Sequence, residues 1–196
     1  GGKLKNAAIP AIMGPRCVRV WQEGLGPGLE ADKRSGPPGA AGLFKRRGEH
    51  MDERVKEAIF RQVGKEPFAR KFGLQLVDLG PGYSKVEMTF TPDMENIFGM
   101  AHGGALFALI DEAFETASNS HGTMAVALNL NTTYVSSPAP GSRLTAEARE
   151  FSRTAKTANY DIRVTDDKGT LIASCQALVY RKGTPLPFLE KGTEET

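Results

Sequence analysis

The chain has 196 residues, of which 40% are hydrophobic and 24% charged, and its formal net charge at pH 7 is +2. This length and composition are typical of one globular domain, and no apolar stretch reaches the roughly 20 residues that a membrane helix needs. The near-neutral charge gives no indication of nucleic-acid binding, and two cysteines, Cys17 and Cys175, argue against a disulfide framework and exclude a Cys-rich metal site. Because the N-terminus lacks the apolar core of a secretory signal, we expect a cytoplasmic protein that binds neither membranes nor nucleic acid.

The first 50 residues differ in composition from the rest. They contain 10 of the 22 Gly, 5 of the 12 Pro, and 9 Lys and Arg against 4 Asp and Glu, and they show no sustained period. Their end, KRRGEH, would be encoded by AAG-AGG-AGG-GGN-GAR-CAY, which contains the bacterial ribosome-binding sequence AGGAGG. We therefore expect residues 1–50 to be either a non-native leader before a natural start at Met51 or a flexible extension, with the folded domain at 51–183 and a loose polar tail at 184–196.

Periodic patterns begin after residue 51. Apolar residues recur at spacings of four over 55–63, between charged residues, which predicts an amphipathic helix that ends near Gly64 and Pro67. Two strands are expected on either side of the turn at 80–82, because apolar and charged or polar residues alternate in the second of them, over 85–90.

The most apolar helix is expected over residues 103–119. Its run from 105 to 110 covers every face of a helical wheel, so its first half should be buried all round. Four strand-like segments follow, and Asp166 to Gly169 are typical of a hairpin turn between the last two. Consecutive strands with short links favour an antiparallel sheet, so we predict an α+β fold in which a curved antiparallel sheet wraps around one long helix.

The segment from 96 to 111, which leads into this helix, carries Asn96, the triplet His102-Gly103-Gly104, and Asp111. Together with the segments ASNSHG, PAPGSRLTAEARE, YDIRVTD and GTLIASCQA, these residues resemble the PaaI-type (phenylacetic acid degradation) thioesterases of the hotdog-fold superfamily. The resemblance covers roughly residues 51–182. It implies hydrolysis of an acyl-coenzyme A thioester without a metal or a bound redox cofactor, by a dimer or a pair of dimers.

Thioester hydrolysis needs a site that stabilises negative charge on the carbonyl oxygen. The first N–H groups of a helix lack internal partners at the positive end of its dipole, and glycine lets a ligand approach them closely. Gly103 is therefore a candidate oxyanion hole, although Gly103 and Gly104 could serve only a tight helix start. The resemblance assigns the oxyanion role to the amide of Gly103, and we place Gly104 beside it in the substrate-binding site.

Asp111 is the candidate base or nucleophile, because a carboxylate near apolar walls has a raised pKa and can activate water or attack the carbonyl. By charge alone, Asp111, Glu112 and Glu115 would form the wet face of the helix. The resemblance selects Asp111 and leaves Glu112 and Glu115 as surface charges. Gly103 and Asp111 lie about 12 Å apart along a helix axis, whereas reacting groups must come within about 3.5 Å. If both act on one thioester they come from two chains, which predicts at least a twofold dimer.

The remaining candidates support this pair. Asn96 could donate a hydrogen bond to the thioester or cap its own loop, and His102 could orient the Gly-Gly turn. In some relatives a hydroxyl on the strand after the helix assists the water. Ala127 departs from that pattern here, and Asn129 or Asn131, on one face of that strand, could substitute.

Coenzyme A carries phosphates, so basic residues should line the way to the site. Arg153 and Lys156, near predicted strand ends, are candidates, although exposed charges are common at sheet edges. Phe98, Phe107 and Phe114 could accommodate an aromatic or medium-chain acyl group, or could simply be core.

Two alternatives use the same fold. A hotdog hydratase or dehydratase normally pairs an Asp with a catalytic His in another arrangement, which His102 beside two glycines fits poorly. A noncatalytic acyl-CoA-binding module would have no use for Asp111.

Overall fold

The computed structural model describes residues 50–189, so the expected leader or extension lies outside the described residues apart from His50. The elements follow in the order α2 (Glu53–Val63), α3 (Pro67–Phe72), β1 (Gln75–Gly80), β2 (Tyr83–Thr89), the 3-10 helix η2 (Pro92–Met94), α4 (Gly103–Asn119), β3 (Thr123–Tyr134), β4 (Arg143–Arg153), β5 (Thr157–Thr165) and β6 (Leu171–Pro185). The predicted order of one helix, two strands, a long helix and four strands is confirmed, and α3 and η2 are additions to it.

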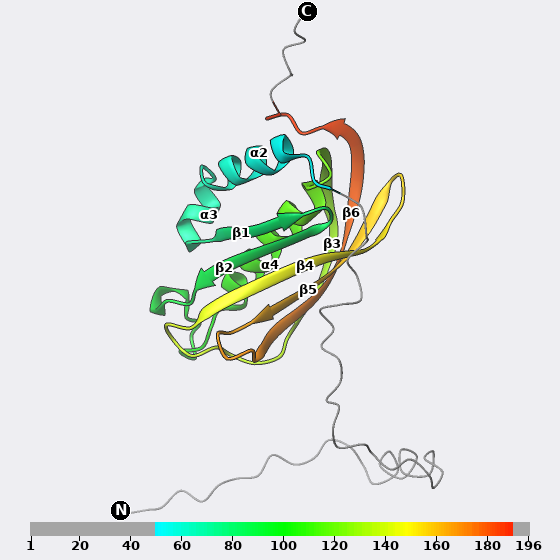
Figure 1. Ribbon diagram of the computed structural model, residues 1–196. Helices are drawn as coiled ribbons and strands as arrows, with labels where there is room; N and C mark the ends of the chain where they lie inside the picture. Colours follow the sequence, from blue (N-terminus) through cyan, green and yellow to red (C-terminus); the bar gives the residue numbers. More distant parts are fainter. Residues whose placement is uncertain (1–49, 190–196) are drawn as a thin grey trace, which may run out of the picture. The chain divides into compact units, whose positions relative to one another are not determined.

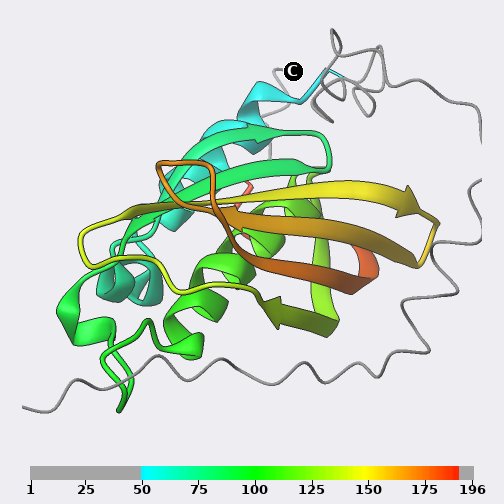
Figure 2. The same cartoon turned by 90° about the horizontal axis from the view of Figure 1, so that it is seen from below.

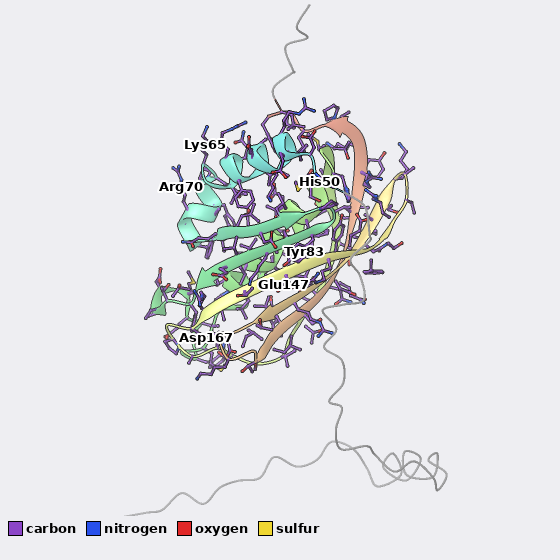
Figure 3. The ribbon with its side chains drawn as sticks, viewed as in Figure 1. His50, Lys65, Arg70, Tyr83, Glu147 and Asp167 are labelled. Carbon is purple, nitrogen blue, oxygen red and sulfur yellow. The ribbon has the colours of Figure 1, made fainter. Side chains whose placement is uncertain are left out.

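The six strands form one antiparallel sheet in the order β1-β2-β4-β5-β6-β3. The sheet is curved and α4 lies along one of its faces (Figures 1 and 2). In β2, the buried Val86 and Met88 face the core, while Tyr83 is only partly buried. Tyr83 and Glu147 of the neighbouring β4 are among the side chains on the other face (Figure 3). The α+β hotdog architecture predicted from the sequence is confirmed.

The core is built around α4, which packs against β2, β3 and β4. Leu109 and Ile110 are fully buried, and Phe114 meets Tyr160 of β5 with 5.4 Å between the ring centroids. Fully burying a side chain of this kind contributes about 1.5–3 kcal/mol. The buried first half of this helix is thus confirmed except at Phe107, which is only partly buried.

Two hydroxyl groups fix the β1–β2 hairpin on α4. Ser84 donates to the carbonyl of Ala113 at 2.6 Å, and the N–H of Gly82 donates to the Ser120 hydroxyl at 2.7 Å. Both bonds are buried, so each satisfies a polar group that would otherwise lose its hydrogen bonds to water.

The two short helices cover the start of the domain. α2 buries its apolar stripe as predicted, and Asp52 caps it by accepting the N–H of Arg54 at 2.9 Å. The expected helix ends at Val63 with Gly64 as its C-cap, and Pro67 begins α3, because proline suits the first turn of a helix.

At the other end of the domain, β6 continues to Pro185, two residues beyond the boundary at 183 suggested by the sequence, and Leu186 is buried. Within residues 50–189, no helix is long and apolar enough to span a membrane.

Candidate active site

The start of α4 is shaped by the triplet His102-Gly103-Gly104. His102 is the N-cap residue, and its Nδ1 accepts the N–H of Gly104 at 2.9 Å. A nitrogen that accepts carries no proton, so this bond places the ring proton of neutral His102 on Nε2. Within the described residues, the N–H of Gly103 donates to no other group, so it is available to a ligand. The expected role of His102 in orienting the Gly-Gly turn agrees with this arrangement.

Close approaches explain both glycines. A Cβ at Gly103 would lie 3.2 Å from the ring of Tyr134, and a Cβ at Gly104 would lie 3.0 Å from Nδ1 of His102. Side chains at these two positions would therefore displace Tyr134 or the helix cap. Tyr134 also donates its hydroxyl proton to the carbonyl of Gly103 at 3.0 Å, which fixes the end of β3 to the start of α4.

Asn96 organises the loop before α4. Its Oδ1 accepts the N–H of Phe98 at 2.8 Å and that of Met100 at 3.2 Å, which agrees with the expected capping of local backbone. No described group accepts a hydrogen bond from its Nδ2. Asn96 and Gly103 both line an open pocket of about 330 Å³, together with apolar side chains that include Leu106.

Asp111 lies eight residues beyond Gly103 on the same helix and is partly buried. Burial raises the pKa of its carboxyl, which makes it a stronger proton acceptor once it is ionised. Among residues 50–189, no group donates a hydrogen bond to this carboxylate, so its lone pairs are available for a water molecule or a substrate.

Glu112 shows where the sequence interpretation was wrong. The side chain is not a surface charge but is only 3% exposed, whereas Glu115 is exposed as expected. Burial, followed by repulsion from Glu66 and Glu115, raises the pKa of Glu112 to about 8. A helical wheel could have indicated this, because Glu112 lies three residues after the buried Leu109 and four before the buried Thr116.

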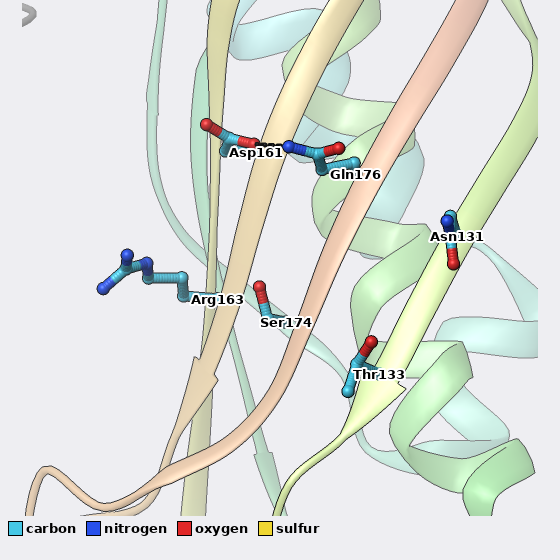
Figure 4. A pocket seen from close by; sticks show the side chains of 6 residues that line it. All are labelled: Asn131, Thr133, Asp161, Arg163, Ser174 and Gln176. Carbon is cyan, nitrogen blue, oxygen red and sulfur yellow. Dashed lines mark hydrogen bonds between the residues drawn. The ribbon is translucent and has the colours of Figure 1, made fainter. Parts of the chain in front are cut away.

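Asn129 and Asn131 lie on the sheet face that points away from α4. Asn131 pairs with the exposed Gln176 of β6, and Asn129 pairs with Leu178 two residues further along β6. Asn131 lines a polar hollow on this outer face with residues of β5 and β6, among them Arg163 (Figure 4). The sheet therefore separates both side chains from Asp111 of the same protomer, so neither substitutes there for the missing hydroxyl.

Arg153 and Lys156 lie at the opposite end of α4 from Gly103. Arg153 donates to Nδ1 of His121 at 2.7 Å, just beyond the last turn of α4, and its side chain is only 21% exposed. Lys156 is exposed, with its Nζ 5.9 Å from the centre of the Tyr180 ring. Of the two basic residues expected to meet coenzyme A phosphates, only Lys156 extends into solvent.

The structure thus brings Asn96, Gly103 and Tyr134 together and leaves Asp111 two helical turns away. Tyr134 was missed from the sequence, because a tyrosine at the end of a strand gives no signal of which helix terminus it will reach. Phe114, a possible acyl contact, is core.

Comparison with known proteins identifies the family to which this chain belongs. A thioesterase superfamily model matches residues 98–173. A protein of Archaeoglobus fulgidus, classed provisionally as an esterase, is 35% identical over 137 residues, which are 70% of this chain and 87% of the relative. The acyl-coenzyme A thioesterase PaaI of Escherichia coli is 32% identical over 115 residues, which are 59% of this chain and 82% of the relative.

Solved structures have the same fold. The structure of E. coli PaaI matches with a TM-score of 0.66 at 27% identity, over 69% of this chain and 98% of that one. A Streptococcus mutans protein solved bound to acetyl CoA matches with a TM-score of 0.55 at 26% identity, over 58% of this chain and 91% of that one. The chain therefore belongs to the thioesterase superfamily, among the PaaI-type members of the hotdog fold.

Proposed function

We propose that this protein hydrolyses acyl-coenzyme A thioesters at a site shared by two copies of the chain. The observation that carries this proposal is the N–H of Gly103, which points outward from the start of α4 and has no partner among the described residues. An unpaired amide at the positive end of a helix dipole is suited to stabilise an oxyanion. The acetyl CoA bound by the S. mutans relative supports coenzyme A as the carrier.

In the proposed reaction, the thioester carbonyl oxygen accepts the N–H of Gly103. Asp111 of the partner subunit removes a proton from water, and the resulting hydroxide attacks the carbonyl carbon. The negative charge that develops on oxygen is stabilised by the Gly103 amide and the helix dipole. The carbon–sulfur bond then breaks, and the sulfur takes up a proton, so the products are a carboxylic acid and free coenzyme A. Direct attack by Asp111, followed by hydrolysis of the anhydride, has the same balance.

Two further features support this assignment. Asn96 lines the same pocket as Gly103, and its Nδ2 is a donor for the thioester. The pocket wall is apolar at Leu106 and Val135, which suits an acyl chain rather than a charged group.

A thiol-release assay with a panel of acyl-CoA substrates tests the reaction. We expect Asp111→Asn to lower kcat by at least about a hundredfold, because a positioned general base contributes about 10²–10⁴ in rate. Asp161→Asn, at an exposed carboxylate on the outer face of β5, is the matched control and should retain wild-type activity. Water addition without free thiol would identify a hydratase instead, and binding without turnover would identify a noncatalytic module.

A further inference from the structure

Three carboxylates gather where the start of α3 meets the middle of α4. Glu66 precedes α3, and Glu112 and Glu115 lie on α4. One oxygen of each carboxylate lies within 4.8 Å of the corresponding oxygens of the other two. This arrangement opposes folding unless a proton or a cation neutralises part of the charge, because like charges at such distances repel.

Glu112, the buried one of the three acids, is the residue that most clearly needs a ligand. Glu112 is 3% exposed, and its Oε1 has no hydrogen-bond partner in the described part of the chain. Between residues 50 and 189, no lysine, arginine or histidine forms an ion pair with any of the three acids. A buried carboxylate without hydrogen bonds or a counter-charge is costly, so an orphaned oxygen at this position calls for a bound group.

We propose that Glu66, Glu112 and Glu115 bind a hard divalent cation, for which Ca²⁺ has the best-matching size. Ca²⁺ takes oxygen ligands at about 2.3–2.6 Å, so ligands on opposite sides of the ion are up to about 5 Å apart. The spacing of up to 4.8 Å within the trio falls within this limit. A set of carboxylates without histidine or cysteine favours Ca²⁺, Mg²⁺ or Mn²⁺ over zinc or copper.

The surroundings leave space for the ion and its water. The three acids line one pocket of about 280 Å³ together with the polar side chains of Gln62 and Asn119. Glu115 is exposed and Glu66 partly so, which gives the cation a path from solvent. Water molecules in this pocket can complete the coordination, as is usual when three carboxylates supply only part of the shell.

Such an ion would join the link between α2 and α3 to the middle of α4. Glu66 lies in the link between α2 and α3, whereas Glu112 lies in the buried middle of α4. The site is separate from the Gly103 pocket, since no residue lines both. It lies beside Asp111, whose charge, after burial, contributes to raising the pKa of all three acids, and it adds a metal site to a chain whose sequence suggested none.

Isothermal titration calorimetry and thermal unfolding of the full-length chain, stripped of metal and titrated separately with Ca²⁺, Mg²⁺ and Mn²⁺, test the proposal. We expect saturable binding of about one cation per chain and a rise in Tm of several degrees for the wild type. Glu112→Gln and Glu115→Gln should each weaken binding by at least about tenfold. Glu57→Gln, which removes an exposed acid on α2 outside the trio, is the matched control and should bind as the wild type does.

Thermal unfolding gives a second measurement. The Tm of Glu112→Gln should no longer respond to added metal, whereas that of Glu57→Gln should rise as the wild-type Tm does. The proposal is overturned if no cation raises the wild-type Tm or binds with saturation, or if Glu115→Gln, a change at an exposed side chain, binds as tightly as the wild type. These outcomes are read from binding and unfolding alone, so a failure of the metal site is distinguishable from a failure of thioester hydrolysis, which the thiol-release assay measures.

Discussion

At the scale of single residues, the oxyanion role proposed for Gly103 can be tested by removing its amide hydrogen alone. Proline at this position would remove the N–H, and it is tolerated at the first position of a helix. The preceding His102 already has φ −68° and ψ 130°, the extended conformation that a residue before proline requires. Any side chain here also approaches Tyr134, so the effect of bulk has to be separated from the loss of the donor.

Gly103→Pro should therefore be compared with Gly103→Ala, which has the same Cβ and retains the N–H. We expect the proline variant to have a kcat about 10²–10³ below that of the alanine variant, the usual cost of losing one oxyanion donor. Steady-state kinetics on one acyl-CoA measure the ratio, and circular dichroism checks that both variants fold. Equal rates for two folded variants would mean that this amide does not stabilise the transition state.

At the scale of elements, a buried network joins β4, β5 and the end of α4. Glu150 accepts hydrogen bonds from His121 and Tyr160, each at 2.9 Å, and pairs with Arg153 at 3.4 Å. Burial alone would raise the pKa of Glu150, but the contacts with His121, Tyr160 and Arg153 outweigh it and hold the pKa below its ordinary value. The ionised carboxylate is thus favoured by folding.

Because the pKa of Glu150 is lower in the folded state, its contribution to stability is complete above the unfolded value near 4.5 and is lost as the pH falls below it. Glu150→Gln should lower the free energy of unfolding at pH 7 by about 3 kcal/mol, since it removes the buried carboxylate that accepts hydrogen bonds from His121 and Tyr160. It should also weaken the loss of stability between pH 5 and pH 3. Urea unfolding across this range measures both effects, and a variant with the acid sensitivity of the wild type would contradict the assignment.

Most helices and strands could be predicted from the sequence, because the spacing of apolar residues indicates which of the two forms. The spacing of apolar residues in α2 and the continuous apolar run in α4 are local patterns, and both were confirmed. Two features failed for a physical reason. Pro67 was read only as a helix end, whereas it begins α3, and Glu112 was read by its charge, whereas its spacing from Leu109 and Thr116 places it on the buried face of α4.

Only part of the candidate site could be predicted from the sequence, because some of its contacts are local in the chain and others are not. The peptide donors at Gly103 and the cap at His102 depend on neighbours in the chain, so sequence motifs indicate them. The contact of Tyr134 with Gly103 and the outward direction of Asn131 depend on strand register, which connects residues more than 30 positions apart. Sequence spacing alone could not give that register.

At the scale of the whole molecule, the two edges of the sheet differ. β1 is a short edge strand of 6 residues that lies beside α2, whereas β3 is an edge strand of 12 residues. Large apolar side chains are exposed along β3 and in the loop before α4, namely Ile97, Phe98, Met100, Val126, Leu128, Tyr134 and Val135. A long, open and apolar edge normally indicates a surface that another chain covers. A second copy of this chain on that edge would place two α4 helices on one continuous sheet.

If the two helices share each site, two inactive variants should restore activity to each other. Asp111→Asn lacks the acid and Gly103→Pro lacks the amide donor, so a mixed dimer contains one site with both groups intact and one with neither. After unfolding and refolding an equal mixture, half of the dimers are mixed, and we expect about a quarter of the wild-type activity per chain. Each variant refolded alone is the control and should stay inactive. If both groups instead act within one chain, every site in the mixture still lacks one of them, and the mixture stays as inactive as its components.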